Sequence, residues 1–269
     1  MIPKIIHYCW FGGNPLPQQA RECIETWKKH CSDYEIKEWN EQNFDLSMFP
    51  YTKEAYENRK FAFVTDVVRL YALYNEGGIY MDTDVEVLKP LDAFLNHNAF
   101  SGFENIKDVP TGIMASEKGG KWAKENLEYY SGRHFVNTDG TLDTTTNVMV
   151  ITSYMITHGL VRNNTYQDFP GLITMYPKDY FCPKSYLDGK IYLTENTVAI
   201  HHFAGSWMTE EQKYYLKSRK KYHFLPRKVA DYTSNFVTAK KYHGILVAFD
   251  GLFERLVLRK IRKSISRKK

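Results

Sequence analysis

One stretch of the sequence, residues 65–84, constrains the fold more than any other. Its first part predicts a helix, because apolar side chains recur at helical spacing and Thr65 can cap the N-terminus. Gly77 and Gly78 then end the helix, since glycine readily adopts the left-handed conformation of a C-cap. A short apolar strand, 79–81, follows at once. A helix that leads straight into a buried strand is typical of an α/β sheet.

Two aspartates, Asp82 and Asp84, stand at the end of this strand. Alternate residues of a strand point to the same side, so the two carboxylates share one side with the Tyr80 side chain. A hard divalent cation uses carboxylate oxygens and often completes its shell with substrate phosphates. A bare Asp-x-Asp pattern is common by chance. The apolar strand and the capped helix before it are the context that favours a metal site here.

The N-terminal sequence predicts a strand at 4–10, a helix at 18–30 and a second strand at 34–39. This succession favours parallel strands within one sheet. Trp10 stands at the end of the first strand, where doubly wound sheets bind ligands. Its indole is suited to stacking on a nucleotide base, although a buried core position is the commoner role for tryptophan.

A second polar group follows a predicted strand at 198–203 and consists of His202 with Gly205, Ser206 and Trp207. Neighbouring residues of a strand face opposite sides, so at most one histidine of the His-His pair is a metal ligand. Imidazole suits Mn²⁺ beside carboxylates, glycine lets the backbone approach a phosphate, and the indole N–H is a donor. The alternative is a structural histidine beside a packing tryptophan.

Asp66 and Arg69 lie one turn apart on the helix that leads into the Asp-x-Asp strand. One interpretation is a surface ion pair that contributes only a few tenths of a kcal/mol. The other places both residues at a sugar, where Asp66 accepts hydrogen bonds from hydroxyls and Arg69 presents a planar fork of donors.

Together these segments resemble the DXD-motif sugar transferases of the capsular-polysaccharide and mannosyltransferase group, and the catalytic domain of the large clostridial glucosylating toxins. The segments that carry the resemblance are 5–13, 65–71, 77–84 and 201–207. The resemblance implies a GT-A type fold, that is, α/β with a Rossmann-like mixed sheet flanked by helices. It also implies Mn²⁺ or Mg²⁺, a nucleotide-sugar donor that we expect to be UDP-linked, and retention of anomeric configuration. The acceptor would be a glycan or a lipid-linked saccharide of capsular or surface polysaccharide synthesis.

The resemblance also implies roles for individual residues. Asp66, Arg69 and Asp82 would be catalytic, and Asp82, Asp84 and His202 would hold the metal. The toxins have a carboxylate where His202 aligns, so this ligand follows the other relatives. The expected nucleotide-sugar site comprises Tyr8, Trp10, Asp66, Arg69, Tyr80, Asp82, Gly205, Ser206 and Trp207.

Other functional classes fit less well. A phosphatase of the haloacid-dehalogenase type also has Asp-x-Asp after an apolar strand, but it has a small or hydroxyl residue where this chain has Glu86. A non-catalytic sugar-binding module has no need of a diphosphate clamp. Both readings remain alternatives to the transferase.

The net charge of +5 is unevenly distributed. Residues 252–269 carry eight basic side chains and one acidic one, so the rest of the chain is slightly acidic. This argues against nucleic-acid binding by the body. Leucine and isoleucine recur among the cations, which predicts an amphipathic tail that binds an anionic membrane surface.

We expect a catalytic domain at 1–210 and a helical extension at 211–269 that includes this tail. The sequence has neither a signal-peptide pattern nor the roughly 20 consecutive apolar residues of a membrane span. We therefore expect a cytoplasmic protein that is peripheral at the inner face of the cell membrane.

Overall fold

The computed structural model describes residues 1–110, 112–185, 188–205 and 210–248. The contacts divide the chain into two units: the first is Met1–Lys184 with Ile191–Ala204, and the second is Ser185–Lys190 with the chain from Gly205 onward. The first unit thus ends before the expected boundary at residue 210. A functional division at that point stays a prediction.

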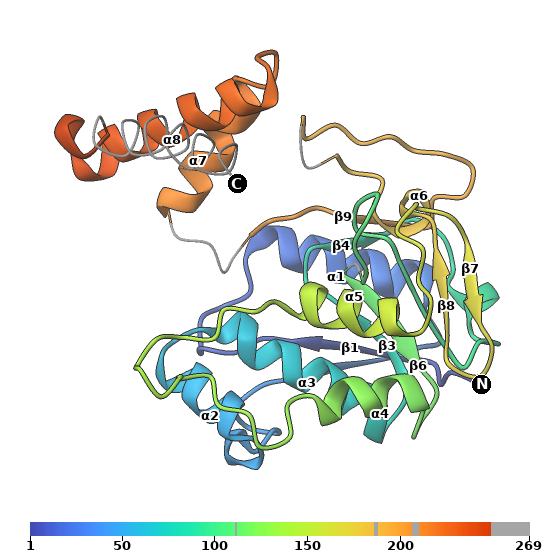
Figure 1. Ribbon diagram of the computed structural model, residues 1–269. Helices are drawn as coiled ribbons and strands as arrows, with labels where there is room; N and C mark the ends of the chain where they lie inside the picture. Colours follow the sequence, from blue (N-terminus) through green and yellow to red (C-terminus); the bar gives the residue numbers. More distant parts are fainter. Residues whose placement is uncertain (111, 186–187, 206–209, 249–269) are drawn as a thin grey trace, which may run out of the picture. The chain divides into compact units, whose positions relative to one another are not determined.

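The first unit is built on a seven-stranded mixed sheet with the order β2-β1-β3-β6-β5-β8-β7 (Figure 1). Strand β1 pairs in parallel with both β2 and β3, whereas β6 is antiparallel to β3 and to β5. Strand β8 is parallel to β5 and antiparallel to β7. The strands are β1 (Ile5–Cys9), β2 (Glu35–Trp39), β3 (Gly78–Met81), β5 (Ala99–Gly102), β6 (Ile113–Ser116), β7 (Gln167–Phe169) and β8 (Ile173–Tyr176).

Helices cover both faces of this sheet, with α1 on one face and α3 and α4 on the other (Figure 1). The side chains of β3 point alternately to the two faces of the sheet. Ile79 and Met81 pack in the core that contains Trp27 of α1, whereas Tyr80 packs in the core on the side of α3. The helices of this unit are α1 (Gln18–His30), α2 (Pro50–Glu57), α3 (Phe61–Asn75), α4 (Lys121–Glu128), α5 (Asn147–Thr157) and α6 (Lys178–Phe181), with short 3₁₀ turns at Leu46–Met48 and Asp92–Phe94.

These elements confirm the predicted α/β class, with a mixed sheet flanked by helices. The predicted first two strands and the helix between them are also confirmed. The helix before the Asp-x-Asp strand begins earlier than expected, at Phe61. Thr65 is not its cap, because its hydroxyl donates to the Phe61 carbonyl inside the helix (2.9 Å). The apolar stripe continues upstream through Val64, which is why the helix extends.

A buried histidine fixes the chain where α3 turns into β3. His7 on β1 donates from Nε2 to the carbonyl of Gly77 (2.7 Å) and accepts at Nδ1 from the indole of Trp39 on β2 (3.1 Å). A methyl group at Gly78 would lie 2.6 Å from the Ile5 carbonyl and 3.0 Å from His7 Nε2. Glycine is therefore needed both for the turn and for the close approach of β3 to β1.

A separate two-stranded ribbon joins β4 (Val85–Val87) to β9 (Ala199–His201) in antiparallel register, with Val85 opposite His201. The predicted strand at 198–203 is thus confirmed in its first part and ends at His201.

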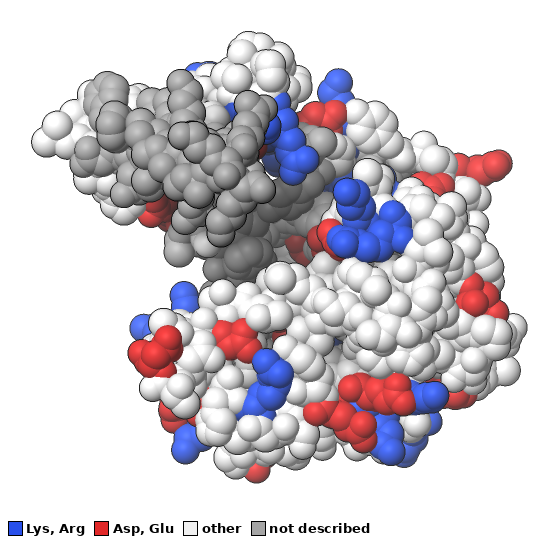
Figure 2. All heavy atoms as spheres, viewed as in Figure 1, with Lys and Arg blue, Asp and Glu red and all other residues white. Residues whose placement is uncertain are grey.

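The second unit contains a helical hairpin, α7 (Glu210–Lys221) and α8 (Arg227–His243), whose helices lie side by side (Figure 1). The amphipathic tail predicted for 252–269 lies outside the described residues. None of the described helices is both long enough and apolar enough to cross a bilayer. On the face drawn in Figure 2, acidic and basic side chains are interspersed rather than gathered into one field.

Candidate functional site

The candidate site forms where β3 ends and the β4–β9 ribbon begins. The Asp82 N–H donates to the carbonyl of Gly112 (2.8 Å), and the Val85 N–H donates to the Asp82 carbonyl (3.0 Å). The chain therefore turns between β3 and β4, and this turn carries both aspartates. The antiparallel pairing of β4 with β9 then places His201 beside Asp84.

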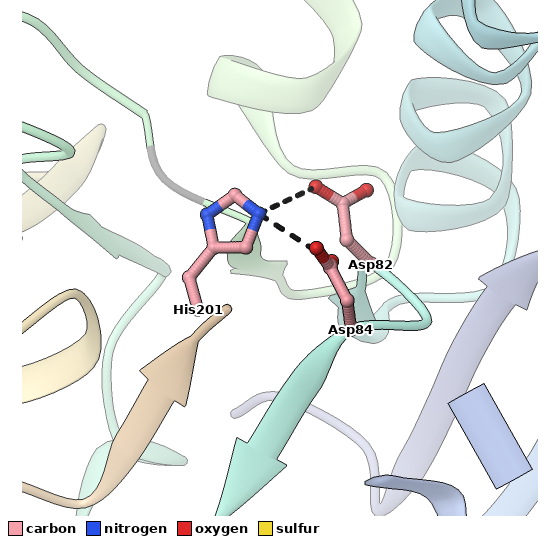
Figure 3. A group of neighbouring side chains, drawn as sticks. All are labelled: Asp82, Asp84 and His201. Atoms are coloured by element: carbon pink, nitrogen blue, oxygen red, sulfur yellow. Dashed lines mark ion pairs between the residues drawn. The ribbon is translucent and has the colours of Figure 1, made fainter. Parts of the chain in front are cut away.

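Three side chains converge at this turn (Figure 3). His201 Nε2 lies 3.8 Å from Asp82 Oδ2 and 3.4 Å from Asp84 Oδ1. One ligand atom from each residue lies within 4.8 Å of the other two. Two carboxylates and one imidazole are a donor set for Mn²⁺, whereas Mg²⁺ prefers oxygen alone. The three residues fit a divalent cation.

The structure brings His201, rather than the expected ligand His202, beside the two aspartates, and a metal-binding role for His202 stays a prediction. Strand β9 ends at His201, so strand alternation no longer sets the direction of the next side chain. The His202 imidazole instead lies 2.8 Å from Glu86 Oε2, and its carbonyl accepts from Lys184 Nζ (2.6 Å). The sequence allowed one histidine of the pair as a ligand, and the register of β4 against β9 favours His201.

The negative charge of Asp84 and the positive charge of His201 stabilise each other. Burial alone would raise the pKa of Asp84, but the His201 charge and hydrogen bonds from His201 and the Ala204 N–H lower this pKa to about 2. Burial would likewise lower the pKa of His201, and Asp84 raises it well above its usual value. Because a metal binds neutral imidazole, cation binding here would release a proton.

The guanidinium of Arg69, on α3, links Asp66 to Asp82. Arg69 Nη2 lies 3.3 Å from Asp66 Oδ1 and 3.4 Å from Asp82 Oδ1. The guanidinium also stacks over the Tyr80 ring, and the Tyr80 hydroxyl donates to Asp82 Oδ1 (2.9 Å). The side chains of Asp66 and Arg69 are only 12% and 11% exposed, so the expected alternative of a surface pair does not hold. Asp66, Arg69, Tyr80 and Asp82 form one connected group.

Asp66 is also held from the opposite side by the first residue of α5. The Asn147 N–H donates to Asp66 Oδ2 (3.1 Å), and Asn147 Nδ2 lies 3.3 Å from the Asp66 carbonyl and 3.2 Å from the Tyr130 hydroxyl. Burial raises the pKa of Asp66 to about 6, against the opposing effects of Arg69 and the Asn147 N–H.

Three more residues of the site were not anticipated from the sequence: Gly112, Glu104 and Asn147. A methyl group at Gly112 would lie 2.9 Å from Asp82 Oδ2 and 3.1 Å from the His201 ring. Burial raises the pKa of Glu104 to about 7, although the charge of His201 lowers it. Of these three residues, only Asn147 had a signal in the sequence. Thr146, which caps α5 by accepting from the Met149 N–H, marks Asn147 as the first residue of a helix.

The remaining predicted residues lie around this centre or outside the described chain. Tyr8 on β1 is buried and donates from its hydroxyl to Glu38 Oε2 (2.6 Å). Trp10 follows β1, is partly buried, and donates from Nε1 to the Asn14 carbonyl (2.5 Å). Gly205 begins the longer segment of the second unit, and Ser206 and Trp207 lie outside the described residues.

Comparison with known proteins places this site in a family context. Residues 17–101 match the model of the glycosyltransferase sugar-binding region containing a DXD motif. This range includes Asp66, Arg69, Asp82 and Asp84 but ends well before His201.

Curated relatives match over less than half of this chain. Inositol phosphoceramide mannosyltransferase 3 of Schizosaccharomyces pombe is 30% identical over 126 residues, which are 44% of this chain and 34% of the relative. An uncharacterised glycosyltransferase of Acanthamoeba polyphaga mimivirus is 32% identical over 120 residues, 42% of this chain and 48% of that protein. The chain thus matches a third to a half of the length of these relatives.

Solved structures of glycosyltransferases are also similar. One, involved in glycosylation of the major capsid of PBCV-1, is 13% identical, with a TM-score of 0.44 over 83% of this chain and 100% of that chain. The PaToxG glycosyltransferase is 15% identical, with a TM-score of 0.41 over 59% of this chain and 70% of that chain. The sequence match over residues 17–101, which contains four acidic and basic residues of the site, makes this part of the chain similar to the DXD-motif sugar transferases.

Proposed function

We propose that this protein is a metal-dependent glycosyltransferase that moves a sugar from a nucleotide sugar to a hydroxyl of an acceptor. The observation that carries the proposal is the convergence of Asp82 and Asp84 with His201 at the end of β3. The match of residues 17–101 to the DXD sugar-binding region supports it. A bound cation would neutralise the negative charge that develops on the departing diphosphate.

The side chains around the proposed cation would hold the metal, position Asp82 and bind the donor sugar. Asp84 and His201 would hold Mn²⁺ or Mg²⁺ together with Asp82. Arg69 keeps Asp82 in place, because it contacts this carboxylate and the Tyr80 ring at once. Asp66, fixed by Asn147 and Arg69, would accept hydrogen bonds from hydroxyls of the donor sugar. These mutual contacts favour a preorganised site.

We infer that the donor base stacks on Trp10 and that Gly205, Ser206 and Trp207 contact the diphosphate. Trp10 follows the strand β1 that adjoins β3, so it lies at the same edge of the sheet as Asp82. Trp10→Ala should weaken binding of the free nucleotide by about 1 to 3 kcal/mol. An unchanged nucleotide affinity would assign Trp10 to the core instead.

We propose a UDP-linked hexose or N-acetylhexosamine as donor and transfer with retention of configuration. The described site residues include no side chain that we assign as an enzymic nucleophile. A donor phosphate oxygen would then take the proton of the acceptor hydroxyl on the same face. Two curated relatives, from fission yeast and budding yeast, are named for mannosyl transfer to inositol phosphoceramide, so a mannose donor is the competing assignment.

For the acceptor we propose a glycan or a lipid-linked saccharide, with surface polysaccharide synthesis as the setting. The yeast relatives are named for inositol phosphoceramide, which supports a lipid-linked acceptor. A cytoplasmic location at the inner face of the cell membrane, with the tail 252–269 as a contact, belongs to the same proposal.

The test is a donor screen that measures nucleotide release with Mn²⁺, using UDP-linked and GDP-linked sugars in parallel. Release from one donor that stops in EDTA, and stops in the Asp84→Asn variant, is the expected result. Transfer without added metal would remove the metal site from the proposal. Hydrolysis of a simple phosphate ester, with every nucleotide sugar left intact, would favour the phosphatase instead.

A further inference from the structure

The second unit carries an exposed turn between α7 and α8 that the proposed transferase chemistry does not use. The two helices pack through small buried residues, among them Ser218, Ala230 and Ser234. An ion pair between Arg219 Nε and Asp231 Oδ1 (2.7 Å) joins them next to the turn. The turn, residues 222–226, is therefore presented by a packed hairpin (Figure 1).

Positive charge is concentrated around this turn. The stretch 212–230 contains seven lysines and arginines and no aspartate or glutamate. Four of these cations flank the turn and are exposed: Lys220, Lys221, Arg227 and Lys228. With the residues that the structure describes, none of the four forms an ion pair.

An aromatic side chain stands among these cations. Phe224 is 71% exposed, more than any other phenylalanine or tyrosine in the described chain. Val229, on the first turn of α8, is 47% exposed. A single exposed apolar residue is ordinary, but a phenylalanine at the tip of a turn with cations on both sides is the arrangement that anchors proteins at membrane interfaces.

Helix stability explains only half of this charge. Lys220 and Lys221 lie in the last turn of α7, where cations favour the helix dipole. Arg227 and Lys228 lie in the first turn of α8, which contains no acidic residue. Cations at that end oppose the dipole, so this placement destabilises the isolated helix. An anionic partner at the turn would compensate for it.

We propose that the α7–α8 turn, residues 220–229, docks on the surface of an anionic phospholipid bilayer. Phe224 and Val229 enter the interfacial layer, and the four flanking cations contact lipid phosphates. A bilayer fits better than nucleic acid because the apolar tip has a place to be buried. The inference is independent of the proposed transferase activity and of the tail.

The experiment uses the full chain in co-sedimentation with vesicles of phosphatidylcholine, with and without phosphatidylglycerol. Replacing Lys220 and Lys221 by Gln, or Arg227 and Lys228 by Gln, should each weaken binding to anionic vesicles roughly 30-fold and reduce its salt dependence. Phe224→Ser should weaken binding roughly tenfold at any salt concentration, and Phe224→Trp should preserve it.

Replacement of Lys121 and Lys124 by Gln on α4 is the matched control, since these exposed cations belong to the other unit. The control should bind vesicles as the wild type does, and all variants should keep the cooperative melting transition of the wild type, because the changed side chains are exposed. Equal binding by the wild type and both Gln pairs would overturn the proposal, since the tail alone would then suffice. Binding of single-stranded RNA without binding of vesicles would overturn it as well.

Discussion

His201 Nε2 lies 3.4 Å from Asp84 Oδ1, although the two residues are far apart in the sequence. Asp84 precedes β4 and His201 closes β9, so the antiparallel ribbon is what joins them. The family match covers only the part of the chain that contains Asp84. The candidate metal site therefore depends on a long-range pairing whose second strand, β9, lies outside the matched segment.

The two adjacent histidines allow a direct test of this site. His201→Ala should weaken Mn²⁺ binding at least tenfold, because it removes one of three converging donors. His202→Ala should leave the Mn²⁺ affinity near that of the wild type, since its ring contacts Glu86. Calorimetric titration of both variants with Mn²⁺ measures the difference. The reverse order of effects would restore His202 as the ligand.

Gly112 tests how tightly the site is packed. In Gly112→Ala the new methyl group would lie 2.9 Å from Asp82 Oδ2 and 3.1 Å from His201 ring atoms. We expect Mn²⁺ affinity to fall by about tenfold, as for other changes that displace ligands indirectly. The control is Gly140→Ala, where φ is +80° and nothing lies within 4 Å. It should cost about 1 kcal/mol of stability and leave Mn²⁺ binding unchanged; equal Mn²⁺ affinities in both variants would contradict the crowding argument.

Arg69 is predicted to contribute to stability as well as to the site. Arg69→Met leaves Asp66 and Asp82 without their shared cation and should lower the free energy of unfolding by about 3 kcal/mol. Adding Asp66→Asn should recover part of this loss, because one of the two uncompensated carboxylates is gone. Urea denaturation of the two single variants and the double variant measures the coupling. Strictly additive losses would show that Arg69 acts through packing alone.

Much of the fold was predictable because its signals are local. The apolar runs around β1 and β2, the helix between them and the glycines after α3 each report their own element. The start of α3 was missed because Thr65 resembles a cap, whereas its hydroxyl bonds back into the helix. A hydroxyl in that role is indistinguishable from a cap in sequence.

The candidate site was predictable only where its residues are close in sequence. Asp66, Arg69, Asp82 and Asp84 lie on adjoining elements, so spacing and resemblance found them together. The choice between His201 and His202 depends on strand register, which spacing does not report. Asn147 and Gly112 matter through contacts with Asp66 and Asp82 that cross the fold.

His7 should make the stability of the metal-free protein depend on pH. Its Nδ1 accepts from an indole, which only donates, and its Nε2 donates to a carbonyl, which only accepts, so the ring is neutral with one tautomer. Burial lowers the pKa of His7 below 6.5 despite the hydrogen bond to Gly77, which acts in the opposite direction. Protonation would turn Nδ1 into a donor that faces the Trp39 donor.

The direction of this pH dependence follows from proton binding in the folded and unfolded states. Just below pH 6.5 the unfolded chain takes up a proton at His7 and the folded chain does not, so the free energy of unfolding falls as the pH falls. Asp66 acts in the opposite direction between pH 6 and 3.8, because its raised pKa makes the folded state take up the proton first.

The variant His7→Gln keeps a donor for the Gly77 carbonyl and should remove only the contribution of His7 to the pH dependence. Urea denaturation from pH 7.5 to about 5 should then show a smaller loss of stability on acidification than in the wild type, by at most about 1.4 kcal/mol per pH unit. Identical pH dependence in the two proteins would mean that His7 titrates alike in the folded and unfolded states.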